Sequence, residues 1–326
     1  MTALALKYSD ICLEPRYSEL ETRSEADTSV SLGDFKFKNP IIPANMRAVI
    51  SPRLCKSLSD DGYFYIMHRF DVNNYQLLVK AREEEWKYTS ISVGVKKSDY
   101  TVIRKIIKAE LSPDFITIDI AHGHSVLVKN MISHIKSLDP NIFVIAGNVA
   151  TPRGCADLAN WGADCVKVGI GQGNVCTTKD KTGFTMPMYT CVKNCVDHMP
   201  HLRDKSQKTV KIIADGGIKC NGDIAKAINA GADMVMSGSM FSCCQNSPCK
   251  SVVIDGKIYK QYFGSASEHN KGHKKHIEGV MKQVSSNNMT YNEKLTEIEQ
   301  DLQSAISYSG GKNVNCIRAA SYYIIK

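Results

Sequence analysis

Eight short apolar runs, each followed by a stretch of helical length, constrain the fold of this chain more than any other feature. The runs cover residues 40–44, 63–67, 89–93, 115–119, 142–146, 164–168, 210–214 and 234–236. Stretches with helical length and apolar spacing include 51–61, 126–138, 152–161 and 221–230. Strands that alternate with helices form a parallel sheet, and eight such units predict an α/β fold of the (β/α)8 TIM barrel type.

A doubly wound open sheet is the alternative architecture. Such a sheet usually carries its glycine-rich phosphate loop directly after the first strand. This chain has Asn45-Met46-Arg47 at that place. The sequence therefore favours the closed barrel.

One domain spanning residues 1–326 is the simplest organisation, because no linker rich in proline, glycine or serine divides the chain. After the eighth apolar run, residues 250–263 are expected to form a hairpin around Asp255-Gly256, and residues 292–307 a helix. The polar, basic segment 265–288 between them is predicted to be a loop that acts as a mobile lid.

The charge of the chain points to a small anionic ligand. Lys and Arg number 41 against 33 Asp and Glu, a net charge of +8, and the basic residues are scattered, so nucleic acid is not the expected partner. No apolar run approaches the roughly 18 residues of a membrane span, and residues 1–10 lack the order of a signal peptide. We therefore expect a cytoplasmic protein without a membrane partner, whose 12 cysteines are free thiols.

The loop after the sixth run carries the first candidate site. Glycines at 169, 171 and 173 allow backbone groups to turn inward, so the loop is a candidate nest for an ion or nucleotide. It is not a dinucleotide fingerprint, because Asn174 stands where the last glycine is needed and the loop follows a late strand. Cys176 is a candidate nucleophile at a strand end, and a plain free thiol is the alternative.

The loops after the seventh and eighth runs form the second candidate site. Asp215-Gly216-Gly217 offers a carboxylate for two ribose hydroxyls and amides for a phosphate, and Gly238-Ser239 adds amides and a hydroxyl. Each segment alone could be an ordinary tight turn. Their joint position, after strands seven and eight, is where TIM barrels commonly bind phosphate, which favours a functional reading.

Two histidine-containing segments imitate metal sites. His122 and His124 follow the fourth run, but no carboxylate and histidine set with metal spacing accompanies them. A second group has spacings of four, three and three that suit one helix face better than two separated ligand pairs. That group is Cys191, Cys195, His198 and His201. We expect a metal at neither segment.

Five ordered motifs, each at an expected strand end, resemble those of the IMP dehydrogenase and GMP reductase family. The motifs are Asn39-Pro-Ile-Ile-Pro-Ala-Asn-Met46, Ala146-Gly-Asn-Val149, the loop from Gly169 to Thr178, Ala214-Asp-Gly-Gly-Ile218 and Tyr262-Phe-Gly264-Ser265. The resemblance covers nearly the whole chain. It implies a (β/α)8 barrel that usually forms a homotetramer.

The reductase branch is the closer resemblance. Dehydrogenases of the family usually carry CBS modules after the second strand, and they have a flap with an Arg-Tyr pair. This chain has only residues 71–88 at the place of the CBS modules. No arginine lies between Gly264 and Glu278. The resemblance therefore implies reductive deamination of GMP to IMP and ammonia with NADPH. The alternatives are a dehydrogenase without CBS modules and a non-catalytic barrel that binds purine nucleotide or RNA.

The resemblance also implies roles for individual residues. Cys176 would be the nucleophile, with Thr178 and Glu278 as the pair that protonates the departing ammonia and Glu268 as the fallback. GMP would contact Met46, Asn174, Asp215, Gly216, Gly217, Gly238, Ser239, Tyr262, Gly264 and Ser265. NADPH would contact Asp119, Ala121, His122, Asn148, Lys274 and Lys275. Backbone carbonyls of Gly171, Gly173 and Cys176 would bind potassium, although Gln172 and Asn174 depart from the family pattern in this loop.

Overall fold

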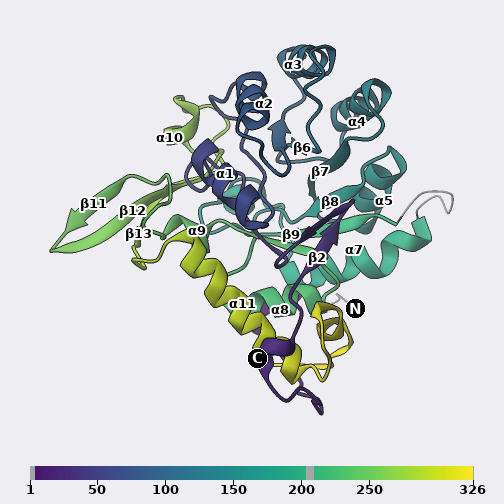
Figure 1. The fold of residues 1–326 in the computed structure, drawn as a ribbon, viewed down its shortest axis with the longest axis vertical. Coiled ribbons are helices and arrows are strands. Elements are labelled where there is room, and N and C mark those ends of the chain that lie inside the picture. The colour runs from purple at the N-terminus through teal and green to yellow at the C-terminus, as the bar shows by residue number, and fades with distance from the viewer. Residues whose placement is uncertain (1–3, 203–208, 326) are drawn as a thin grey trace.

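The computed structural model describes residues 4–202 and 209–325, and a seven-stranded parallel sheet forms its centre (Figure 1). Its strands are β4 Ile41–Pro43, β5 Ser90–Val93, β6 Phe115–Asp119, β7 Phe143–Val149, β8 Cys165–Val168, β9 Lys211–Asp215 and β10 Met234–Ser237. Their order is β4-β10-β9-β8-β7-β6-β5, so the first and last strands of the barrel pair with each other. Seven of the eight predicted strands are thereby confirmed, as is the curled sheet of a TIM barrel.

The predicted strand over Tyr63–Met67 is wrong, because this buried segment forms no hydrogen-bonded ladder. It lies beside β5, where the amide of Met67 donates to the carbonyl of Ser90 over 3.1 Å. The hydroxyl of Tyr65 donates to the carbonyl of Tyr88 and accepts from the amide of Ser90. The Tyr65 hydroxyl therefore bonds to backbone groups that would otherwise pair in a strand ladder. The segment fills the gap between β5 and β4.

Helices surround the sheet, as Figure 1 shows for α2 to α5, α7 and α8. Within the described chain they are α1 Pro52–Asp61, α2 Asn74–Glu83, α3 Lys97–Lys108, α4 Val126–Leu138, α5 Pro152–Asn160, α6 Thr178–Thr182, α7 Met188–Leu202, α8 Asn221–Asn229, α9 Ser239–Ser242, α10 Glu268–Lys271 and α11 Tyr291–Tyr308. Side chains of Ser51, Ser125 and Thr151 accept from amides of the first turns of α1, α4 and α5. These caps explain why the three predicted helices begin where they do.

An aromatic cluster fills the amino-terminal end of the barrel. Phe115 and Phe143 begin β6 and β7, and their ring centroids lie 5.4 Å apart. Phe64 packs against Phe115 at 4.9 Å, and Phe37 against Phe64 at the same distance. Phe37 ends the ribbon of β2 Val30–Leu32 and β3 Phe35–Phe37. Because this end is packed with rings, the opposite end of the strands is available for a site.

A three-stranded antiparallel sheet projects from one side of the barrel (Figure 1). It contains β11 Ser251–Ile254, β12 Lys257–Phe263 and β13 Met281–Ser285. The predicted hairpin is confirmed, and its turn residues Asp255 and Gly256 have φ of 49° and 73°, as a type I′ turn requires. The expectation that 265–288 is all loop is wrong, because α10 and β13 lie within it. Residues 281–285 do not alternate clearly between apolar and polar side chains, so the sequence does not predict the strand β13.

The first and the last strand of the described chain lie side by side, since β1 Ile11–Leu13 pairs antiparallel with β14 Tyr322–Ile324. Cys191, Cys195, His198 and His201 all lie on α7, and among the described residues no three His, Cys, Asp or Glu side chains are placed to hold a metal. None of the helices described here is long and apolar enough to cross a membrane.

Candidate active site

A cavity of about 380 Å³ opens at the carboxyl ends of the barrel strands. We call it the cleft. It is lined by residues from the ends of β6 to β10 and from the segment after β12. The predicted site residues that line it are Met46, Asp119, Ala121, Asn148, Gly171, Gly173, Cys176, Thr178, Asp215, Tyr262, Gly264, Ser265 and Glu278. The fold therefore brings together residues that lie far apart in the sequence.

Three of these residues form a hydrogen-bonded series in the cleft. The hydroxyl of Thr178 donates to a carboxylate oxygen of Glu278 over 2.7 Å. The Thr178 oxygen lies 3.2 Å from the Sγ atom of half-buried Cys176. Because the threonine proton is given to the carboxylate, its oxygen can accept the proton of the thiol. The arrangement can move a proton between a nucleophile and a carboxylate.

Backbone pairing places Glu278 beside the loop that carries the thiol. The amide of Thr177 donates to the carbonyl of Glu278 over 2.9 Å, and the amide of Val280 donates to the carbonyl of Val175 over 3.0 Å. Gly279 between them lies opposite Cys176. A Cβ atom at Gly279 would lie 3.0 Å from the amide nitrogen of Ser267, so this close approach favours glycine.

A charged network lies beside this series and centres on Lys167 of β8. Its ammonium lies 2.6 Å from Asp215 and 3.4 Å from Asp119. Asn148 donates to the same Asp215 oxygen over 2.9 Å, and Arg69 donates to the carbonyl of Asp119 over 3.1 Å. Burial lowers the pKa of Lys167, but Asp215 and then Asp119 outweigh it, and the pKa lies above its ordinary value. The ammonium therefore stays charged.

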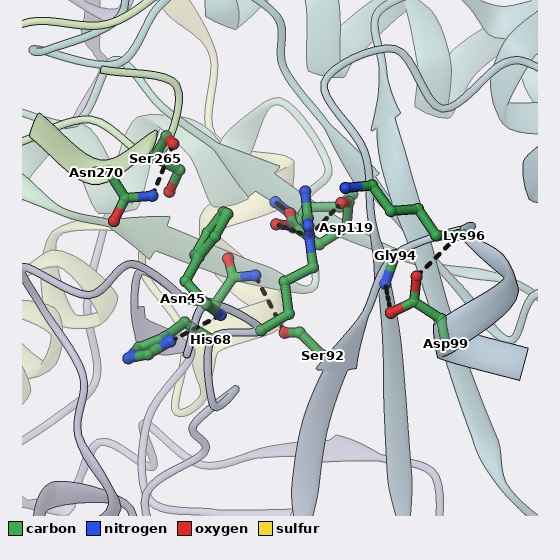
Figure 2. A network of polar contacts seen from close by, with 12 residues as sticks. Asn45, His68, Ser92, Gly94, Lys96, Asp99, Asp119, Ser265 and Asn270 are labelled. Carbon is green, nitrogen blue, oxygen red and sulfur yellow. Dashed lines mark hydrogen bonds and ion pairs between the residues drawn. The ribbon is translucent and has the colours of Figure 1, made fainter. Parts of the chain in front are cut away.

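Figure 2 shows Asp119 among the polar groups at this end of the barrel. The side-chain amide of Asn45 donates to the hydroxyl of Ser92 over 3.3 Å on one side of it. Farther away, the side-chain amide of Asn270 donates to the carbonyl of Ser265 over 2.8 Å. The second contact fastens α10 to the segment that leaves β12, which places the start of the predicted lid next to the cleft.

Two cationic side chains that line the cleft, Arg69 and Lys167, were not singled out from the sequence. Lys167 was detectable as the one charged residue in the strand Cys165–Val168. Arg69 was detectable because it closely follows an apolar run. Lys271 and His276 also line the cleft and belong to the basic run 271–276 of the lid, of which the predicted NADPH contacts include only Lys274 and Lys275.

Other predicted residues do not line the cleft: His122, Asn174, Gly216, Gly217, Gly238, Ser239, Lys274 and Lys275. Gly238 is close to it, since a Cβ atom there would overlap the hydroxyl of Tyr262. Ser239 donates its hydroxyl to the carbonyl of Ile218 over 3.2 Å. Lys274 is largely exposed and lies 3.9 Å from Glu268. The binding roles of these residues stay predictions.

The loop with the two departures from the family pattern is held by contacts of its own. The carbonyl of Gln172 accepts from the amide of Gly217 over 3.1 Å, and its side chain donates to Thr185 over 2.7 Å. Lys282 of β13 donates to the carbonyl of Asn174 over 2.7 Å and lies 3.2 Å from its side-chain oxygen. Asn174 is therefore tied to the three-stranded sheet.

The curled parallel sheet and the thiol in its carboxyl-terminal cleft define an enzyme of the TIM barrel class. The family model described as IMP dehydrogenase / GMP reductase domain matches residues 5–325. The chain therefore belongs to the IMP dehydrogenase/GMP reductase family.

Similar proteins cover almost the full length of the chain. A protein named GMP reductase from Acidovorax sp. (strain JS42) is 48% identical over 322 residues, which are 98% of this chain and 95% of that protein. The protein of that name from Albidiferax ferrireducens is 50% identical over 97% of this chain and 94% of its own. The one from Staphylococcus carnosus is 47% identical over 98% and 96%.

Proposed function

We propose that this chain is a GMP reductase, which converts GMP to IMP and ammonia with NADPH as the reductant. The observation that carries the proposal is the series Cys176, Thr178 and Glu278 in the cleft. Replacing an amino group on a purine ring needs a nucleophile and a group that gives the amine a proton. Similarity near half identity to proteins named GMP reductase supports the same reaction.

The first step is the activation of the thiol. Cys176 gives its proton to the Thr178 oxygen while Thr178 gives its own proton to Glu278. The products are a thiolate and a neutral carboxylic acid. The thiolate then forms a carbon–sulfur bond at carbon 2 of the guanine ring, and the electron pair of the double bond between carbon 2 and N3 moves to N3.

The second step is the departure of ammonia. The acid at Glu278 returns its proton through Thr178 to the amino group on carbon 2, and the carbon–nitrogen bond breaks as the electron pair on N3 re-forms the double bond to carbon 2. The purine is then joined to Cys176, and the carboxylate of Glu278 is restored. NADPH, when bound, supplies the hydride that replaces sulfur on carbon 2, which frees the thiolate and gives IMP.

The cleft suits both ligands of this reaction. Asp215 has a carboxylate that can accept from the ribose hydroxyls of GMP, and Tyr262 lies beside Gly238 where the phosphate is expected. Asp119 and Asn148, which also line the cleft, are the residues proposed to contact the nicotinamide, and the hydrogen bond from Asn148 to Asp215 makes the two ligand sites adjacent. Lys271 of the lid adds a positive group and His276 a ring nitrogen, both of which fit the phosphates of NADPH, as Lys274 and Lys275 do in the prediction.

Four further parts of the proposal do not come from the cleft. A homotetramer and potassium on the carbonyls of Gly171, Gly173 and Cys176 come from the family resemblance, whereas a cytoplasmic location and a single domain with a mobile lid come from the sequence pattern. Carbonyl oxygens are suitable ligands for potassium. The Gly173 carbonyl already accepts from the amide of Cys176 over 3.0 Å, which leaves it one lone pair. No step above requires the ion.

The reaction is tested by following NADPH absorbance with the purified chain. We expect NADPH to be consumed only when GMP is present, with IMP and ammonia formed in equal amounts. A parallel reaction with IMP and NAD should stay at the background rate, because the segment 265–277 holds no arginine for a water-activating flap. Reduction of NAD by IMP would assign the chain to the dehydrogenase branch instead, and silence in both reactions would leave a nucleotide-binding barrel.

An Asp215→Asn variant should raise the KM for GMP by about 10- to 100-fold, because a charged acceptor of two ribose hydroxyls is replaced by a weaker one. Steady-state rates at varied GMP measure the change. Asp233→Asn is the matched control, since Asp233 is similarly buried and paired with Lys211 and Arg318 away from the cleft. Equal KM values in the wild type and Asp215→Asn would remove Asp215 from the GMP site.

A further inference from the structure

Lys167 is a charged side chain in a strand that is otherwise apolar. Its side chain is 3% exposed, between neighbours Val166 and Val168. Its ammonium is held by Asp215 at 2.6 Å and Asp119 at 3.4 Å. A buried ion pair is commonly no more stabilising than apolar side chains of similar volume. Stability alone therefore does not explain a lysine at this position, which also lines the cleft.

The backbone next to Lys167 leaves room for its reach. Asp119 pairs with Gly147, and Gly147 pairs with Lys167, so the three residues form one row across β6, β7 and β8. A Cβ atom at Gly147 would lie 2.6 Å from the Cβ of Lys167 and 2.7 Å from its carbonyl oxygen. A side chain at 147 is thus excluded by close approach, and the lysine can extend over β7 to Asp119.

The two carboxylates that share Lys167 face different ligands in the proposed function. Asp215 would accept from the ribose of GMP, and Asp119 would lie beside the nicotinamide. A ligand that changes the charge or position of one carboxylate changes the force on the ammonium, and therefore on the other carboxylate. Both are largely buried, at 22% and 19% exposure, so water screens this interaction weakly.

We propose that Lys167 is a positioning residue that couples the binding of GMP to the binding of NADPH. This inference rests on the proposed function. It assigns Lys167 no contact with the reacting atoms. Its effect is on the affinity of each ligand when the other is present, and such coupling must be reciprocal.

The test uses a Cys176→Ala background, in which bound GMP and NADPH do not react. Calorimetry gives the Kd of GMP with and without saturating NADPH. We expect the two values to differ by about fivefold or more, and the ratio to approach one after Lys167→Met. An unchanged ratio in Lys167→Met would overturn the proposal, even if both affinities fell, because a merely structural role lowers affinity without removing the coupling.

Two variants control for the loss of a buried ammonium. Lys260 of β12 is 2% exposed and donates to the carbonyl of Gln245 over 2.7 Å, outside the cleft. Lys260→Met should leave the ratio of Kd values unchanged. Lys167→Arg keeps the charge and should retain part of the coupling. Loss of coupling in Lys260→Met as well would overturn the proposal.

A second measurement tests the proposal if Lys167→Met does not fold. In Asp119→Asn, Asp215 is the one remaining carboxylate that pairs with Lys167. The stronger attraction to the ammonium makes Asp215 a weaker acceptor for the ribose hydroxyls of GMP. We expect the Kd of GMP without NADPH to rise by about threefold or more. An unchanged Kd would overturn the proposal. The wild-type assay separates the two conclusions, because GMP-dependent oxidation of NADPH with no coupling defeats this inference only, and absence of oxidation defeats the proposed function.

Discussion

A Cys176→Ala variant is expected to bind GMP and to oxidise no NADPH above the rate seen without GMP. The methyl group of alanine cannot form the bond to carbon 2. Without this bond ammonia is not released, and the covalent intermediate that accepts the hydride does not form. Loss of a nucleophile in a covalent mechanism lowers kcat by about 10⁴-fold or more. NADPH absorbance at saturating GMP measures the rate, and calorimetry measures the GMP affinity, which should change little.

A second cysteine gives the matched control for this variant. Cys220 is exposed and lies outside the cleft, so Cys220→Ala removes an accessible thiol without touching the proposed chemistry. Its rate should equal that of the wild type. Full activity in Cys176→Ala would contradict a covalent route and leave direct reduction of the ring. Inactivity in both variants would point to a general loss of structure.

The barrel could be predicted because each of its strands is a local apolar run that ends at a distinct loop. Residues 115–119 and 126–138 are predicted with their observed bounds for this reason. The segment 63–67 has the same apolar pattern and forms no strand. Its apolar pattern reflects burial, whereas its hydrogen bonds include the one from the Tyr65 hydroxyl to the Tyr88 carbonyl. Periodicity in the sequence does not predict hydrogen bonds of this kind.

The site could be predicted only in part. Strand ends identify Cys176 and Asp215 from the sequence, since TIM barrels place functional groups there. Glu278 lies 100 positions from Thr178, so its role came from the family resemblance and its position from the backbone pairing of 278–280 with 175–177. Lys167 is visible as a charge in an apolar strand, but its partners depend on how far apart the ends of β6 and β9 lie, and that is a property of the curled sheet.

A Glu278→Gln variant is expected to lower kcat by about 10²- to 10⁴-fold and to leave the KM for GMP within about threefold. Glutamine keeps an oxygen that accepts from Thr178, so the local structure is retained. It cannot take the thiol proton or return it to the amino group, so both the attack and the release of ammonia are slowed. Glu268→Gln is the control, because Glu268 is half-exposed and its ion pair with Lys274 lies outside the cleft.

The hydrogen-bonded series of Cys176, Thr178 and Glu278 also predicts how substitutions at Thr178 and Glu278 combine. Thr178→Val breaks the path between Cys176 and Glu278, so it should lower kcat about as far as Glu278→Gln does. If the proton passes through both side chains in turn, the double variant should be no slower than the slower single variant. Either substitution alone already blocks the proton transfer, so the second has no further effect. Losses that multiply would mean that the two residues act in separate steps, with Thr178 beside the thiol and Glu278 at the amine.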